Sequence, residues 1–406
     1  VIKRYCKGCN SNCSLFFVSL CKLKIKRFFL GECMGGLPFG GNISVLRFAL
    51  VAAIGGFLFG FDSGVINGTV EGLRSAFQWD SVGTGFNVAS MLLGCAVGAF
   101  VAGQLADRWG RRNVMLLAAA LFLISAWGSG ISDSSPEFVF YRIIGGLAVG
   151  AASIICPAYI SEIAPPKVRG SLATLQQVAI ISGLFASFLS NYTVAGIAGS
   201  SLELWWWGFE AWRWMFWAEL IPAGLFVLLL LTIPESPRFL VSSGRDLDAL
   251  SVLAKVGEEL PEQKLADIKT SISNSPRPAL ADCFEGGRLL QPIVWIGIGM
   301  AILQDVSGIN VVFYYGAVLW QSVGSTESDA LLINVVSGGI SIVACLIAVA
   351  YVDRIGRRPL LVVGSIGMAI ALTVVATAFG SGSIDENGQL VLSPNLGVIA
   401  LIAANL

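Results

Sequence analysis

An acidic side chain interrupts an apolar segment close to the start of the chain. Asp62 stands in the run GFLFGFDSGVINGTV at 56–70, where most other residues are apolar or small. A carboxylate inside a membrane-spanning segment is costly, so it indicates a functional site unless it reaches the outer interface and is hydrated there. A carboxylate can also carry a proton, and the chain contains no histidine that could do so instead. Proton transfer is therefore the first chemistry that this sequence suggests.

A short basic motif occurs twice, as DRWGRR at 107–112 and as DRIGRR at 353–358. Its arginines can set membrane topology, its glycine permits a tight turn, and a guanidinium group can pair with carboxylates at neighbouring helix ends. Acids and bases also occur together in SEIAPPKVRG and PESPR. We expect these groups to latch the cytoplasmic ends of two helix bundles together, with a role in topology alone as the alternative. The expected latch consists of Asp107, Arg108, Gly110, Arg111, Arg112, Glu162, Arg169, Glu235, Arg238, Asp353, Arg354, Gly356, Arg357 and Arg358.

The composition indicates that these residues lie in or beside a lipid bilayer. The 406 residues are 55% hydrophobic and 13% charged, and the mean hydropathy is +0.76. Such a composition is too apolar for a water-soluble globule. The net charge is zero, which argues against a nucleic-acid partner. The chain is therefore expected to be an all-α, multi-pass protein of the cell membrane.

Nine apolar segments are long enough to cross a hydrocarbon core, which takes roughly 20 helical residues. They lie near 45–66, 82–104, 113–131, 138–160, 171–191, 212–233, 291–320, 329–352 and 359–380. A tenth begins near 396 and has only half of the required length at Leu406. We therefore expect the chain to be a fragment of a longer protein.

The two basic motifs divide the chain into similar halves. They lie 246 residues apart (353 minus 107), the first between spans two and three and the second between spans eight and nine. Two repeats of six helices, with a substrate site between them at mid-membrane, are typical of secondary transporters. The predicted regions are a cytoplasmic tail at 1–44, which is alternatively sequence upstream of the true start, a first half at 45–233, a polar cytoplasmic linker at 234–290 and an incomplete second half at 291–406.

Lysine and arginine are distributed unevenly between the two sets of loops. The loops at 105–112, 161–170 and 353–358 carry eight of these residues, whereas the loops of the opposite set carry only Arg74. Short loops rich in lysine and arginine face the cytoplasm. The N-terminus and both DRxGRR motifs are therefore predicted to be cytoplasmic.

Six segments resemble, in order, the signatures of the sugar porter family of the major facilitator superfamily. They are GFLFGFDSGVINGTV at 56–70, GQLADRWGRR at 103–112, YRIIGGLAVGAASIICPAYISEIAPPKVRGSL at 141–172, PESPRFL at 234–240, LQDVSGINVVFYYG at 303–316 and VDRIGRRPLL at 352–361. The resemblance covers about residues 45–406. It implies the major facilitator fold and transport of a hexose, pentose or polyol, by facilitated diffusion or by proton symport.

The resemblance also implies a partner for Asp62. In this respect the chain resembles proton-coupled members of the family, which have an aspartate at the position of Asp62, whereas facilitators tend to have a neutral side chain there. Arg142 matches the membrane arginine of the family. Burial favours the protonated carboxyl group, and a nearby arginine favours the carboxylate. If the two side chains separate and rejoin during the cycle, Asp62 would take up and release a proton.

Polar residues in the fifth and seventh spans supply the chemistry that a sugar requires. Hydroxyl groups need amide and hydroxyl partners of fixed geometry, and the C–H side of the ring needs an aromatic face. For Gln177 a helix-to-helix hydrogen bond is the alternative, and Gly308 allows the seventh span to unwind at a cavity. The residues that match the sugar-binding and gate positions of the family are Gln177, Gln304, Asp305, Asn310, Tyr314 and Tyr315.

Two positions depart from the pattern of the family. Asp305 stands where a second glutamine is usual, which adds an acceptor-only charge beside the sugar. Ser341 occupies a place where relatives often carry a sugar-binding asparagine. Both departures leave the identity of the sugar open.

Other motifs in the sequence have simpler explanations. CKGCNSNC near the N-terminus has the spacing of a metal site, but no second ligand pair and no histidine follows, so no metal and no cofactor are expected. GGLAVG at 145–150 imitates a nucleotide-binding fingerprint, but inside a span it indicates close helix packing. The aromatic run at 205–217 is typical of a membrane interface. Sequons at Asn67 and Asn191 are expected in outer loops.

Together these features predict a monomeric transporter that moves a monosaccharide by alternating access, with a proton. A facilitator without proton coupling is one alternative, and a sugar sensor that binds without transport is another. An enzyme is not expected, because the sequence shows no nucleophile with a base, no metal cluster and no cofactor motif.

Overall fold

The structure is a computed structural model of the chain. It describes residues 43–78, 81–166, 168–258, 260–274, 284–285, 289–306, 309–322, 325–380, 383–384 and 390–391. Residues 1–42 of the predicted tail, which include CKGCNSNC, and the predicted tenth span near 396 lie outside the described residues.

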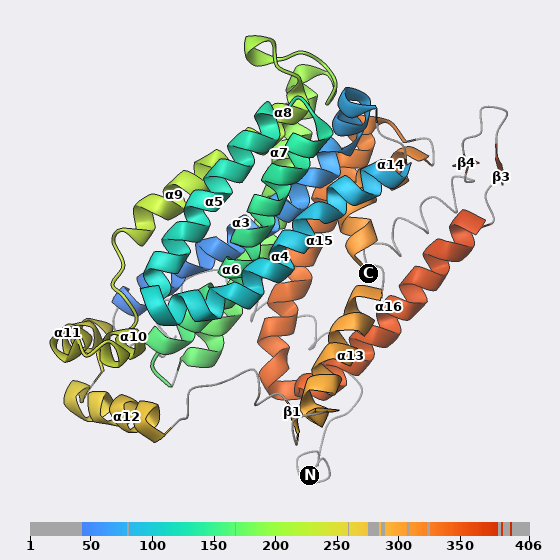
Figure 1. The fold of residues 1–406 in the computed structure, drawn as a ribbon. Helices are drawn as coiled ribbons and strands as arrows, with labels where there is room; N and C mark the ends of the chain where they lie inside the picture. Colours follow the sequence, from blue (N-terminus) through green and yellow to red (C-terminus); the bar gives the residue numbers. More distant parts are fainter. Residues whose placement is uncertain are drawn as a thin grey trace, which may run out of the picture.

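Helices form most of the described chain, and only two short hairpins of strands accompany them (Figure 1). The first half contains α3 (Ile43–Phe77), α4 (Ser81–Trp109), α5 (Arg111–Ile131), α6 (Ser135–Ile163), α7 (Arg169–Ala198), the short η2 (Trp206–Gly208), α8 (Ala211–Trp217) and α9 (Leu220–Leu230). The linker contains α10 (Pro237–Ser242), α11 (Asp246–Val256), α12 (Pro261–Asn274), β1 (Phe284–Glu285) and β2 (Leu289–Leu290). The second half contains α13 (Pro292–Val306), α14 (Ile309–Ser322), α15 (Glu327–Ile355), α16 (Arg357–Gly380), β3 (Ser383–Ile384) and β4 (Leu390–Val391).

The predicted spans coincide with these helices. Within the described residues, eight segments are long and apolar enough to cross a membrane, and α8 and α9 together form one of them at Ala211–Leu230. The predicted span at 291–320 is instead divided into α13 and α14. Residues 307 and 308, where Gly308 is predicted to unwind the helix, lie outside the described residues.

Glycines allow the helices of the first half to approach closely. A Cβ atom on Gly146 would collide with the carbonyl oxygen of Met91, and one on Gly150 would collide with that of Cys95, so α6 packs directly against the backbone of α4. Gly60 of α3 meets the backbone of α7 in the same way. Small residues at such contacts are the usual means of packing helices in a membrane. The interpretation of GGLAVG as a packing motif is therefore confirmed.

The helices α10 and α8 lie at opposite ends of the bundle (Figure 1). We call the end near Gly110, Gly356 and α10 the basic end, and the end near Trp206 and α8 the aromatic end. At the aromatic end, α14 packs against α3 and α15 packs against α7, so the two halves touch there. Buried side chains of both halves form one apolar cluster at this end, which includes Val65, Ile66, Val70, Leu73, Trp212, Phe216, Ala317, Trp320, Ala330 and Leu331.

The two sequons do not lie in loops. Asn67 is inside α3 with 2% of its surface exposed, and Asn191 is inside α7 with 0% exposed. The prediction of outer loops at these positions was wrong, because α3 and α7 continue to Phe77 and Ala198, beyond the apolar stretches that the sequence marks. Neither asparagine is accessible for modification in this structure.

Candidate functional site

A buried ion pair lies in the middle of the first half. Arg142 of α6 approaches Asp62 of α3, with 2.5 Å between Nη1 and Oδ1, and each side chain is 1% exposed. The guanidinium group also donates to Met91 Sδ at 2.9 Å and lies over the Phe216 ring. Asp62 is therefore enclosed by protein in this structure rather than hydrated at an interface. The structure brings together the two residues expected to handle a proton.

A second carboxyl group, which the sequence analysis missed, completes this cluster. Glu219, between α8 and α9, is 1% exposed and lies beside both Asp62 and Arg142. Within the described residues, Asp62 Oδ2 and both oxygens of Glu219 are buried without a hydrogen-bond donor. Two carboxylates cannot hydrogen-bond to each other unless one holds a proton. The signal was available, because Glu219 is an acid inside an apolar span, like Asp62.

The cluster of Asp62, Arg142 and Glu219 is not isolated from the second half. The Tyr314 hydroxyl of α14 lies near Ser63 and near the Asp62–Arg142 pair. Gly145 permits a close approach as well, because a Cβ atom there would lie 3.3 Å from Asp62 Oδ2 and would collide with Ser125 Oγ. A residue predicted to bind sugar therefore lies near Ser63, which follows the predicted proton carrier in α3.

The other predicted sugar-binding residues are spread over both halves. Gln177 lies exposed on α7, Gln304 lies exposed on α13, and Tyr315 lies half-buried on α14. The side chains of Asp305 and Asn310 lie outside the described residues. Ser341 on α15 donates a hydrogen bond to the Ser337 carbonyl oxygen at 2.9 Å.

An apolar cavity of about 620 Å³ lies between α3, α7 and α9. Phe57, Phe61, Leu175 and Ile221 are among the residues that line it, and none of the predicted sugar-binding residues does. Since a sugar needs polar partners, this cavity is not the predicted sugar site.

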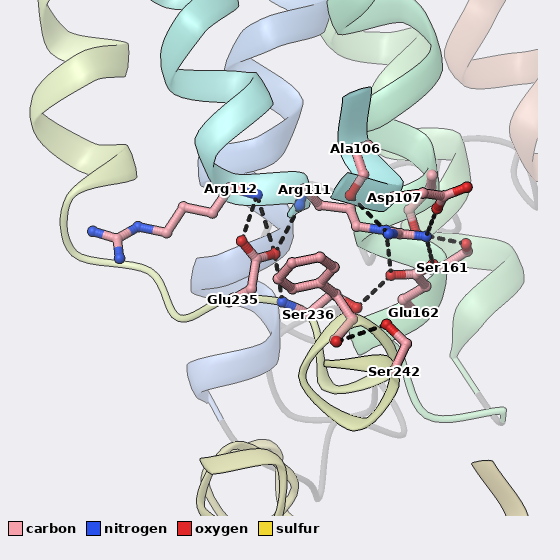
Figure 2. Close-up of polar contacts among 11 residues, drawn as sticks. Ala106, Asp107, Arg111, Arg112, Ser161, Glu162, Glu235, Ser236 and Ser242 are labelled. Carbon is pink, nitrogen blue, oxygen red and sulfur yellow. Dashed lines mark hydrogen bonds and ion pairs between the residues drawn. The ribbon is translucent and has the colours of Figure 1, made fainter. Parts of the chain in front are cut away.

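Glu235 caps a helix at the basic end (Figure 2). Its Oε1 atom accepts hydrogen bonds from the backbone N–H groups of Arg111, at 2.9 Å, and Arg112, at 3.1 Å, which open α5. The first N–H groups of a helix have no partner within the helix, and a negative charge there is favourable. Arg112 reaches the other way and donates to the carbonyl oxygens of Leu230 and Leu231, at 3.0 Å each, where α9 ends.

Among the described residues of this region, Arg111 forms two ion pairs. Figure 2 shows its guanidinium group pointing toward Glu162 of α6 and Asp107 of α4. The Arg111 Nε atom lies 3.2 Å from Glu162 Oε2, and Nη2 lies 3.1 Å from Asp107 Oδ1. Ser236 also donates to Glu162. These contacts tie α4, α5, α6 and the start of the linker into one unit within the first half.

The second copy of the motif repeats the turn. Gly356 precedes α16 with a φ of 88°, as Gly110 precedes α5 with a φ of 93°. Arg108, Arg238 and Arg358 are exposed. The side chains of Asp353, Arg354 and Arg357 lie outside the described residues. Arg169 donates to the Ala164 carbonyl oxygen at 3.5 Å. Within the described residues, the ion pairs of the expected latch therefore join helices of one half.

Comparison with known proteins places these features in a family. The profile of the family described as "Sugar (and other) transporter" matches residues 48–404. A glucose transport protein of Synechocystis sp. is 50% identical over 364 residues, which are 89% of this chain and 77% of that protein. The D-xylose-proton symporter of Escherichia coli is 38% identical over 365 residues, with 82% of this chain and 72% of the symporter covered.

Solved structures agree with this relationship. The partially occluded inward-open conformation of the xylose transporter XylE from E. coli has a TM-score of 0.76 and 36% sequence identity, covering 89% of this chain and 83% of that chain. Its inward-open conformation has a TM-score of 0.70 at 35% identity, covering 89% and 80%.

Proposed function

Because this chain belongs to the sugar (and other) transporter family, we propose that it moves a monosaccharide together with a proton across a membrane by alternating access. Relatives described as a glucose transport protein and as xylose-proton and arabinose-proton symporters support this substrate class. The single observation that carries proton coupling is the buried cluster of Asp62, Arg142 and Glu219.

The charges of this cluster explain how it holds one proton. Two ionised carboxylates beside one guanidinium group leave an uncompensated negative charge in a buried site, which is costly. One proton between Asp62 and Glu219 removes that charge and supplies the donor that their unpaired oxygens lack. Release of this proton becomes favourable when the site gains access to water.

Tyr314 couples the proton to the sugar. Its hydroxyl belongs to the second half, yet it lies near Asp62 and Arg142 of the first half. A sugar that binds between the halves and engages Tyr314 therefore changes the surroundings of the carboxyl groups. The amide groups of Gln177, Gln304 and Asn310, together with Tyr315 and the carboxylate of Asp305, provide the remaining partners for the sugar.

The basic end faces the cytoplasm in this proposal, as does the N-terminus, because the lysine and arginine bias of the loops favours it. Contact between the halves at the aromatic end then means that the outer side is closed. The structure accordingly represents an inward-facing state. The contacts of Glu235 and Arg111 hold the first half together while it moves against the second.

Uptake by the full-length protein in proteoliposomes tests the proposal. With an imposed proton gradient, the wild type is expected to accumulate a hexose or pentose above its outside concentration. Asp62→Asn and Glu219→Gln are expected to lose accumulation and to keep exchange of sugar down its gradient, because each removes a proton-binding group. The exposed Glu137 offers a control, and Glu137→Gln should accumulate normally.

Three results would contradict the proposal in different ways. Full accumulation by Asp62→Asn would show that the proton is carried elsewhere. Wild-type uptake that does not depend on the proton gradient would identify a facilitator. Sugar binding without any uptake would identify a sensor.

A further inference from the structure

Asn67 joins the two halves at the aromatic end. This buried residue of α3 donates from Nδ2 to the Phe313 carbonyl oxygen at 2.6 Å. Its Oδ1 atom accepts from the backbone N–H of Ala317 at 3.1 Å and from Asn334 Nδ2 at 2.8 Å. All three partners belong to α14 or α15, so a single side chain of the first half engages both helices of the second half at this end.

The two backbone partners of Asn67 have a special relation to each other. In a regular α-helix the N–H of each residue bonds to the carbonyl oxygen four residues before it, and Ala317 follows Phe313 by four. The Asn67 amide contacts both of these groups, because Nδ2 donates to the Phe313 carbonyl oxygen and Oδ1 accepts from the Ala317 N–H. Since α14 is continuous from Ile309 to Ser322, these bonds hold α3 to one turn of that helix.

The surroundings leave room for this contact. A Cβ atom on Gly316 would lie 2.6 Å from Asn334 Oδ1 and 3.1 Å from Asn67 Nδ2, so only glycine leaves the space that both amides use. Apolar residues of the two halves, such as Val70, Ala317 and Leu331, enclose the site. In such a setting each amide group needs a protein partner, because water does not supply one.

We propose that Asn67 is the positioning residue that closes the aromatic end of the transporter. In the closed state its amide binds one turn of α14 and the Asn334 side chain of α15. When this end opens, these three hydrogen bonds between the halves break, and the Asn67 amide becomes accessible to water. The same turn of α14 carries Tyr314 and Tyr315, so their position depends on whether Asn67 is bound.

The role in transport rests on the proposed function, whereas the link between Asn67 and closure does not. Distances at the aromatic end can be measured directly by electron–electron resonance between spin labels. Ser75, near the end of α3, and Ser328, near the start of α15, are exposed and suit labelling as Ser75→Cys and Ser328→Cys after the native cysteines are replaced.

Asn67→Ala is expected to shift the labelled full-length protein toward long distances, changing the closed-to-open ratio on the order of tenfold, because three hydrogen bonds across the halves are lost. Gly316→Ala should shift it in the same direction, because its methyl group displaces both amides without removing a polar group. Asn191→Ala is the matched control: Asn191 is equally buried, but it donates to Val65 of its own half, at 3.1 Å.

Transport kinetics add a readout that general destabilisation would not produce. A larger outward-open population lowers KM for external sugar, because more carriers are competent to bind, and slower closure lowers kcat. An unchanged distance distribution in both Asn67→Ala and Gly316→Ala, or an equal shift in Asn191→Ala, would overturn the inference. A shifted distribution in a protein that transports no sugar would instead support Asn67 and refute the proposed function.

Discussion

The two ends of the bundle are held together by different chemistry. At the basic end, Arg111 pairs with Glu162, and Glu235 caps α5, so charged groups tie helices of the first half to one another. At the aromatic end, the amides of Asn67 and Asn334 meet between the halves. Separating a buried ion pair leaves unpaired charges and costs about 3–5 kcal/mol, whereas a neutral amide that exchanges partners costs far less.

This difference suggests that charged and neutral contacts have different roles in the transport cycle. Charged contacts suit surfaces that stay together throughout the cycle, and neutral contacts suit the surface that must part. In this inward-facing state, the ion pairs of the basic end in the described residues form a clamp within the first half. The latch between the halves, which would form when this end closes, stays a prediction. Substitutions at the basic end should therefore lower stability, and substitutions at the aromatic end should change conformation.

Substitutions of the glycines in the two basic motifs should have the largest effect on stability, and they test the prediction for the basic end. Both have positive φ values near 90° and ψ values near 160°, a region that is strained for any other residue. Gly356→Ala should cost about 2 kcal/mol from backbone strain alone. Gly110→Ala should cost about twice as much, because its methyl group would also collide with the Glu235 carboxylate.

Thermal unfolding in detergent, followed by tryptophan fluorescence, measures this difference. Gly110→Ala should melt at a lower temperature than Gly356→Ala, whose nearest neighbour would be Pro359 Cδ at 3.9 Å. Equal melting temperatures would mean that the Glu235 cap does not hold the turn.

Arg111→Ala should have the next largest effect. It removes the ion-pair partner of Glu162, whose side chain is only 12% exposed, and should lower stability by about 3 kcal/mol because the Ser236 hydroxyl does not compensate the charge of the carboxylate. Arg108→Ala changes an exposed arginine of the same motif and should lower the melting temperature very little. Spin-label distances at the aromatic end should stay unchanged in both variants. A shift toward the open state in Arg111→Ala would contradict a clamp confined to the first half.

Glu327→Gln should have the smallest effect, and it tests whether only neutral contacts close the aromatic end. Glu327 is a charged residue that joins the halves at the aromatic end, because its Oε1 atom accepts from the Ser201 backbone N–H at 3.0 Å. A glutamine oxygen can replace that acceptor, so we expect a change in the closed-to-open ratio of about threefold or less. Asp329→Asn, which alters a residue bonded to Thr326 of the same helix, is the control. A tenfold change in Glu327→Gln alone would show that charge also closes this end.

The fold could be predicted because the bilayer imposes a simple rule. Each crossing needs a long apolar segment, and those segments are visible in the sequence. The ends of the helices were harder, because α3 and α7 continue past their apolar stretches through packing against neighbours. This continuation is why Asn67 and Asn191 lie in helices rather than in loops.

The sequence predicts a site residue only where the type of that residue is unusual for its segment. Asp62 was conspicuous as an acid in an apolar run, but Glu219 follows an aromatic run that drew the interpretation toward a membrane interface. The partners of Arg111 were less accessible, because each half repeats the same motif, and residue types do not say whether an acid pairs within a half or across it. The contact of Asn67 with Asn334 joins positions 267 residues apart, and nothing in the local sequence of either marks it.

The buried cluster of Asp62, Arg142 and Glu219 has an electrical consequence. With one proton it is neutral, and without the proton it carries one negative charge. Moving one elementary charge through the full membrane potential is worth about 2.3 kcal/mol per 100 mV. In the proposed cycle the loaded carrier is therefore almost insensitive to voltage, whereas an interior-negative potential drives the empty carrier back to its outward-facing state. Because this return step opens the aromatic end, the potential should accelerate that opening, although the Asn67 contact itself is uncharged.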